Sequence, residues 1–155
     1  MGYVEDIRKQ VGSVPIFMPC AAGTFFKDNK ILLQKRKDDG TWAVHGGSLE
    51  LGETFVEALK RELKEELNID VKKAQFVKSY SGKTMHHIYP NGDEVYCVVE
   101  IYIITDYDGN ISPDKGELEE VKWFDIDKLP QNLHEVDILP IQDSISFAKE
   151  HKIIK

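Results

Sequence analysis

Residues 47–69 decide the fold of this 155-residue chain, and they read GSLELGETFVEALKRELKEELNI. Thr54 with Glu57 three residues later forms a capping box, which favours the start of a helix. Asn68, a residue type that tolerates the left-handed conformation, stands where the helix should end. The stretch therefore predicts a helix over residues 54–67, with one apolar stripe made of Val56, Leu59, Leu63 and Leu67.

Strands dominate the rest of the chain. Apolar or alternating segments predict them over residues 16–26, 31–36, 71–81, 85–89, 94–105 and 121–124. The Pro90–Asp93 segment is a strong hairpin signal. Helical spacing predicts a short helix within residues 1–12 and a closing helix over 138–149. We expect a single domain over residues 1–155, of the α+β class, with helices packed against a mixed sheet.

The composition excludes several classes of protein. A formal net charge of -7 argues against non-specific nucleic-acid binding, which depends on many basic contacts to phosphate. No apolar run reaches the roughly 18 residues that a membrane span requires, and the first residues do not resemble a signal peptide. Cys20 and Cys97 lack metal-binding spacing and are expected to be free thiols. We expect a cytoplasmic protein, monomer or homodimer, that binds neither membrane nor nucleic acid.

Three carboxylates share one face of the predicted helix. Glu62, Glu65 and Glu66 are spaced by three and four residues, so they fall within an arc of roughly 100°. We expect the neighbouring basic residues to point elsewhere and leave these acids unneutralised; they are Lys60, Arg61 and Lys64. A hard divalent cation would relieve the repulsion and bridge to a substrate phosphate. The alternative is an ordinary solvated acidic face.

The residues before the helix strengthen the metal interpretation. Gly46 and Gly47 let the backbone approach a ligand closely, and a carbonyl there could reach a metal ion. Glu53 and Arg61 are eight residues apart, so an ion pair between them could fix the loop against the helix.

The spacing of Gly47, Glu53 and the segment from Arg61 to Ile69 resembles the Nudix box. The resemblance implies an α/β/α sandwich with a largely antiparallel mixed sheet. It also implies Mg²⁺ or Mn²⁺ held by Glu62, Glu65, Glu66 and the Gly46 carbonyl, with Glu53 and Arg61 orienting loop and helix. Two positions depart from the family pattern: Asn68 stands in place of Gly, and His45 in place of Pro.

Family members hydrolyse a nucleoside diphosphate linked to another group, with water attacking phosphorus. The resemblance thus implies a pyrophosphohydrolase acting on a small phosphorylated nucleotide. The alternative within enzymes is an ADP-ribose or nucleotide-sugar pyrophosphatase rather than an enzyme for nucleoside triphosphates. A different class is an inert nucleotide-binding sensor, against which the complete acid set argues.

The sequence leaves alternatives open for the general base and for the residues that contact the substrate. The base is expected to be Glu65 or Glu117, with Glu119 and Glu120 as competitors. Arg36 could reach a phosphate and Trp42 could stack on a base, although surface charge and core packing are the ordinary alternatives. His86 and His87 should face opposite sides of a strand, and no third ligand has suitable spacing, so we do not expect a zinc site.

Overall fold

The structure is a computed structural model that describes residues 2–154. The first half contains α1 (Tyr3–Val11), β1 (Ile16–Thr24), β2 (Phe26–Lys27), β3 (Lys30–Lys35), β4 (Trp42–Ala43), β5 (His45–Ser48) and α2 (Phe55–Leu67). The second half contains β6 (Asp70–Tyr80), the short 3-10 helix η1 (Lys83–Met85), β7 (His86–Ile88), β8 (Glu94–Asp108), β9 (Glu120–Asp125), η2 (Glu135–Asp137) and α3 (Ile138–Glu150). No helix in the described range is long and apolar enough to cross a membrane.

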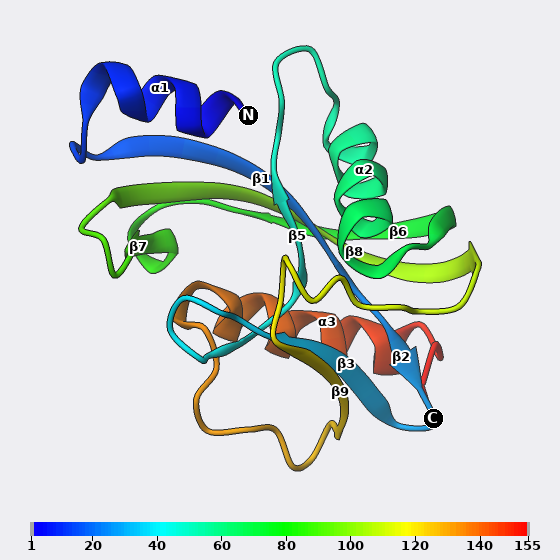
Figure 1. The fold of residues 1–155 in the computed structure, drawn as a ribbon. Helices are drawn as coiled ribbons and strands as arrows, with labels where there is room; N and C mark the ends of the chain where they lie inside the picture. Colours follow the sequence, from blue (N-terminus) through cyan, green and yellow to red (C-terminus); the bar gives the residue numbers. More distant parts are fainter. Residues whose placement is uncertain (1, 155) are drawn as a thin grey trace.

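Two sheets and two packed helices form the body of the molecule (Figure 1). The larger sheet has the order β5-β1-β8-β6, with β7 paired to β8, and only the β1–β8 pair is parallel. The smaller sheet has the order β2-β3-β4, with β9 paired to β3. Helix α2 lies on one side of the larger sheet and α3 on the other (Figure 1). The predicted α+β class and the α/β/α sandwich are confirmed.

The long strand β8 contributes to a core on each face of the sheet. Ile101 and Ile103 belong to the core that also contains Ile141 and Ile145 of α3. The intervening Tyr102 and the next residue, Ile104, belong to the core on the α2 side. Successive side chains of a strand point to opposite faces, so a nearly continuous apolar run can supply both cores.

Helix α2 begins and ends as its sequence predicts. The Thr54 and Glu57 side chains both make the capping-box hydrogen bonds, and Asn68 is left-handed with φ 57°. Leu59, Leu63 and Leu67 are fully buried. The inclusion of Val56 in the stripe was wrong, because its side chain is 38% exposed and Ala58 is buried in its place.

Two other expectations need adjustment. The strand predicted over residues 16–26 is interrupted at Phe25, which is buried and contacts the rings of His45 and Tyr107. The chain passes from one sheet to the other at this residue. The helix predicted within residues 1–12 is α1, and Met1 lies outside the described residues. Helix α1 buries none of its residues, and Arg8 ties it to the start of β8 through the Glu94 carbonyl.

Candidate active site

Glu66 is the most deeply buried acid of the α2 face, with 6% of its surface exposed. Its Oε1 accepts a hydrogen bond of 3.0 Å from the Gly46 amide, and its Oε2 accepts one of 3.2 Å from the Gln34 side chain. Burial, followed by the charge of Glu62, raises the pKa of Glu66 to about 8, although the two hydrogen bonds oppose this. The surroundings of this carboxyl therefore favour a proton or another positive charge.

Glu62 lies one turn earlier, directly over Gly47. A Cβ atom on Gly47 would come within 2.5 Å of the Glu62 carboxyl carbon, so a side chain there would displace this carboxylate from its present position. Gly46 has φ 153°, and a Cβ atom there would come within 2.1 Å of the Ala21 carbonyl oxygen. The two glycines therefore differ: the backbone of the neighbouring strand excludes a side chain at Gly46, whereas a side chain at Gly47 would displace the Glu62 carboxylate.

Glu53 and Arg61 form a bidentate ion pair. Arg61 Nε donates to Glu53 Oε2 at 2.7 Å, and Nη2 donates to Glu53 Oε1 at 2.9 Å and to the Ser48 carbonyl at 3.0 Å. Arg61 also lowers the pKa of the Glu53 carboxyl. The loop before α2 is therefore held against the helix, in the geometry expected of this pair.

The direction of the Arg61 side chain differs from the one expected from the sequence. Its Nη1 lies 2.9 Å from Glu62 and 3.5 Å from Glu65, so this basic residue does not point away from the acids. Arg61 precedes Glu65 by four residues and has a long side chain, which together bring its guanidinium over the face. Lys64 does point away and lies 3.4 Å from Asp70. Burial still raises the pKa of Glu62, and the charges of Glu65 and Glu117 add to the effect.

The loop between β8 and β9 lies against the end of α2. The Ser112 amide donates to the Leu67 carbonyl at 2.9 Å, and the Asp114 amide donates to the Glu66 carbonyl at 2.8 Å. Leu118 is fully buried and anchors the loop. The exposed Glu117 is close enough for its charge to raise the pKa values of both Glu62 and Glu66.

The competing acids of the same loop lie elsewhere. Glu119 is held at Lys35, whose carbonyl accepts from the Glu119 amide at 3.0 Å and whose ammonium lies 4.0 Å from the carboxylate. Glu120 is the first residue of β9. Of the loop acids, Glu117 is thus the one whose charge acts on the helix carboxyls.

The donor set suits a hard divalent cation. Glu62, Glu65 and Glu66 supply carboxylate oxygens from one helix face, and Arg61, which contacts Glu62 and Glu65, is shared with Glu53. Mg²⁺ and Mn²⁺ prefer oxygen ligands and accept a few carboxylates completed by water. The pKa values of Glu62 and Glu66 are raised mainly by burial and further by neighbouring carboxylates, so a bound cation would be favoured over bare negative charges.

A cavity of about 220 Å³ adjoins the paired glycines. The Arg36 guanidinium lies at this cavity, 5.8 Å from the centre of the Tyr89 ring, and Asp38 binds it through two hydrogen bonds of 3.0 and 2.8 Å. The buried Asp137 accepts a hydrogen bond of 3.0 Å from the Val44 amide, and burial raises its pKa to about 7. Polar lining residues include Gln34, Arg36, Tyr89, His134 and Asp137.

Trp42 and His45 are both buried in the protein interior. Trp42 is 8% exposed, is absent from the cavity lining, and packs edge-on against Phe124 at 4.8 Å between ring centres. Of the two roles considered for Trp42, core packing is the one observed, and the stacking role is not retained. His45 is fully buried, with Nδ1 2.8 Å from Gln34 Oε1, and burial lowers its pKa to about 3. It supports Gln34, which in turn binds Glu66.

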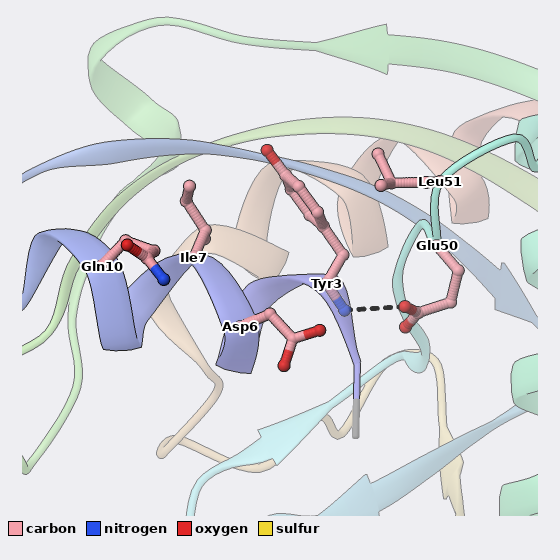
Figure 2. Close-up of a pocket in the computed structure, with 6 residues that line it drawn as sticks. All are labelled: Tyr3, Asp6, Ile7, Gln10, Glu50 and Leu51. Atoms are coloured by element: carbon pink, nitrogen blue, oxygen red, sulfur yellow. Dashed lines mark hydrogen bonds between the residues drawn. The ribbon is translucent and has the colours of Figure 1, made fainter.

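A larger cavity, of about 450 Å³, lies between α1 and the loop before α2 (Figure 2). Glu50 accepts a hydrogen bond of 2.7 Å from the Tyr3 amide beside it. None of the three α2 carboxylates lines this cavity, so it is separate from the acidic face.

The fold and the acidic helix are those of a Nudix-type α/β/α domain. A family model described as the NUDIX domain matches residues 18–143. This chain therefore belongs to the Nudix family.

Individual relatives agree with the family assignment. The ADP-ribose pyrophosphatase of Methanocaldococcus jannaschii is 37% identical over 112 residues, which cover 70% of this chain and 62% of the relative. The NAD-capped RNA hydrolase NudC of Vibrio atlanticus (strain LGP32) is 32% identical over 130 residues, which cover 82% and 42%. This chain thus spans less than two thirds of either relative. The MutT NUDIX hydrolase from Burkholderia pseudomallei superposes with a TM-score of 0.71 at 25% identity, covering 83% of this chain and 98% of that one.

Proposed function

We propose that this protein is a Mg²⁺- or Mn²⁺-dependent pyrophosphohydrolase that cleaves the diphosphate linkage of a nucleoside diphosphate derivative. The observation that carries the proposal is the pair of inward-facing carboxyls, Glu62 and Glu66, held over Gly46 and Gly47 with raised pKa values. ADP-ribose and NAD both contain a diphosphate attached to adenosine. The names of the two relatives therefore favour such linked substrates over nucleoside triphosphates.

Each residue of the site has a separate task in this proposal. Glu62, Glu65 and Glu66, with the Gly46 carbonyl, hold the metal, which neutralises phosphate charge and activates water when bound. The Glu53–Arg61 ion pair keeps the loop and helix in register. Arg36 contacts the substrate from the cavity, where its charge favours an anionic group. The bound nucleotide occupies the same cavity, next to the paired glycines.

The proton of the attacking water passes to Glu65 or to Glu117. The Glu65 side chain is half exposed, and its ion pair with Arg61 is long at 3.5 Å, which leaves its oxygens accessible. Glu117 approaches from a loop that is hydrogen-bonded to the end of α2. General-base catalysis contributes typically 10²–10⁴-fold, so the loss of the true base should be large.

A matched pair of loop variants separates these candidates. Glu117→Gln should lower kcat by at least about 100-fold if Glu117 is the base, whereas Glu119→Gln should leave kcat unchanged because Glu119 is held at Lys35. If Glu117→Gln is nearly as active as the parent protein, Glu65 takes the role. Glu65→Gln is expected to lose most of the rate under either assignment.

The substrate class is tested with a panel of ADP-ribose, NAD, nucleotide-sugars and nucleoside triphosphates. Reactions in ¹⁸O-water with Mg²⁺ or Mn²⁺, followed by mass spectrometry, identify both the products and the phosphorus attacked. Full activity in excess EDTA would contradict the metal mechanism. A protein that binds nucleotides but cleaves none of them would be a sensor.

The proposed partner is the free nucleotide rather than RNA, because the net charge of -7 disfavours contact with a polyphosphate chain. Free NAD and NAD-capped RNA, compared at equal concentration, test this point, and preferred cleavage of the RNA would reverse it. We also propose a cytoplasmic monomer or homodimer. The free thiols Cys20 and Cys97 support a reducing compartment, and cell fractionation and light scattering test location and assembly.

A further inference from the structure

Three residues far apart in the sequence meet beside the 220 Å³ cavity. Asp39 follows β3, His87 lies in β7, and His134 immediately precedes η2. One potential ligand atom from each of the three lies within 4.8 Å of the other two. The imidazole rings of His87 and His134 are 4.6 Å apart between centres, at an angle of 74°. The sequence spacing offered no third ligand for a histidine of residues 86–87, whereas the fold brings Asp39 and His134 next to His87.

His87 has the features of an oriented metal ligand. The residue is 6% exposed, and its Nδ1 lies 2.8 Å from Glu135 Oε1. Its Nε2 is buried and makes no hydrogen bond with any residue of the described range 2–154. A carboxylate on one ring nitrogen commonly fixes a histidine so that the other nitrogen faces a metal. A buried ring nitrogen without a hydrogen bond is costly, so Nε2 is expected to bind a water molecule or an ion.

Hydrogen bonds also hold the other two residues in place, through the side chain of Asp39 and the backbone of His134. The Asp39 carboxylate accepts from the Thr41 amide at 3.0 Å and from the Thr41 hydroxyl at 2.6 Å. The backbone of His134 donates to the Trp42 carbonyl at 2.7 Å, which fixes the residue beside β4. Arg36 lies 3.8 Å from Asp39, but its charge is also paired with Asp38. The cluster thus combines two imidazoles and a carboxylate in a largely preformed arrangement.

We propose that Asp39, His87 and His134 form a second metal site, separate from the α2 carboxylates, which binds one divalent transition-metal ion such as Zn²⁺. Two imidazoles and one carboxylate are a common protein ligand set for Zn²⁺, with a fourth position left to water or another ligand. Imidazole ligands favour transition metals over Mg²⁺. Bonds of about 2.0–2.1 Å place the ligand atoms of a tetrahedral site roughly 3.4 Å apart, so the three atoms, which lie within 4.8 Å of one another, would close around the ion.

The bound ion would join three otherwise separate segments at the cavity. His134 lines the cavity, and Asp39 and His87 lie within reach of it. The turn after β3, strand β7 and the segment before η2 would then move as one unit. The proposal does not depend on the hydrolase function, because it concerns metal binding at different residues.

Calorimetric titration of the chelator-treated protein with Zn²⁺, in excess Mg²⁺ to occupy the α2 carboxylates, tests the site. One equivalent of Zn²⁺ should bind per chain. His134→Gln, His87→Gln and Asp39→Asn should each weaken binding by about 100-fold or more, beyond the 10–100-fold typical of outer-shell changes. The matched control is His86→Gln, since His86 is adjacent to His87 but pairs with Glu94 at 2.7 Å. It should bind Zn²⁺ normally.

Two further variants keep the test decisive if a ligand variant fails to fold. Glu135→Gln changes an exposed side chain and should weaken Zn²⁺ binding by about 10–100-fold through the orientation of His87. Glu66→Gln should leave Zn²⁺ binding intact. The proposal is overturned if the parent protein takes up no Zn²⁺ in the presence of Mg²⁺, or if Glu66→Gln loses Zn²⁺ while His134→Gln retains it.

Discussion

Glu66→Gln should stabilise the metal-free protein and at the same time abolish its stabilisation by Mg²⁺. The substitution replaces a buried acid, whose pKa is raised to about 8, with a neutral side chain of nearly the same shape. A carboxyl with a higher pKa in the folded chain than in the unfolded chain takes up a proton on folding. Its contribution to stability is complete below about pH 4.5 and is lost as the pH rises through about 8.

The size of the effect follows from that shift. One pKa unit corresponds to about 1.36 kcal/mol, so Glu66 lowers the stability of the metal-free protein by about 4 kcal/mol at about pH 7.5 and by less than about 1 kcal/mol at pH 5. The glutamine side chain still accepts a hydrogen bond from the Gly46 amide. Its own NH2 group, however, faces the NH2 donor of Gln34, and the lost hydrogen bond costs about 1 kcal/mol. The net gain in the free energy of unfolding is about 3 kcal/mol at pH 7.5 and close to zero at pH 5.

Thermal unfolding measures both parts of this prediction. For a chain of this length 1 kcal/mol shifts Tm by roughly 2–4 °C, so the variant should melt roughly 6–12 °C above the parent protein in EDTA at pH 7.5. Added Mg²⁺ should raise the free energy of unfolding of the parent alone, by about 2.7 kcal/mol at a concentration 100 times Kd, and its Tm should rise accordingly. A variant that melts below the parent in EDTA, or a Tm gap of equal size at pH 5, would refute the reasoning.

Three further predictions concern the loop and helix around the site. Gly47→Ala places a Cβ atom 2.5–2.7 Å from the Glu62 carboxylate, so Mg²⁺ affinity should fall at least about tenfold by calorimetry; unchanged affinity would contradict the close contact. Thr54→Ala removes the helix cap and should lower the free energy of unfolding by about 1 kcal/mol in urea titrations, whereas a cost near zero would mean that the cap is dispensable. Asn68→Gly should be nearly neutral in the same assay and Asn68→Ala should cost about 1 kcal/mol, because φ is 57°; equal costs would argue against a conformational role.

Local sequence patterns were sufficient to predict the bounds of helix α2 and the relative positions of its acidic residues. The capping box, the left-handed Asn68 and the spacing of Glu62, Glu65 and Glu66 all lie within one segment, where helix geometry alone sets relative positions. The Glu53–Arg61 ion pair spans only eight residues. The contact of Arg61 with Glu62 and Glu65 was missed because side-chain direction depends on rotamers and neighbours.

The features that could not be predicted from the sequence depend on contacts between residues far apart in the chain. Val44 and Asp137 are 93 positions apart and meet only because η2 and α3 return to β4 and β5. Residue type alone does not reveal whether an aromatic side chain lines a cavity, so the sequence left Trp42 open between stacking on a base and packing in the core, where the structure places it. The second sheet likewise depends on β3 pairing with β9, whose residues lie about 90 positions downstream.

The two hydrogen bonds from Ser112 and Asp114 to the last turn of α2 make the loop before β9 a poor candidate for a swinging lid. Carbonyls at a helix end need partners, and the loop amides supply them. Lifting the loop would break both bonds and expose Leu118, at a cost of about 1 kcal/mol for each bond and about 1.5–3 kcal/mol for the leucine side chain. The conformation with the loop lifted off α2 would then be populated at roughly 1% or less. Substrate should therefore enter and leave past Arg36 and Tyr89 while this loop stays in place.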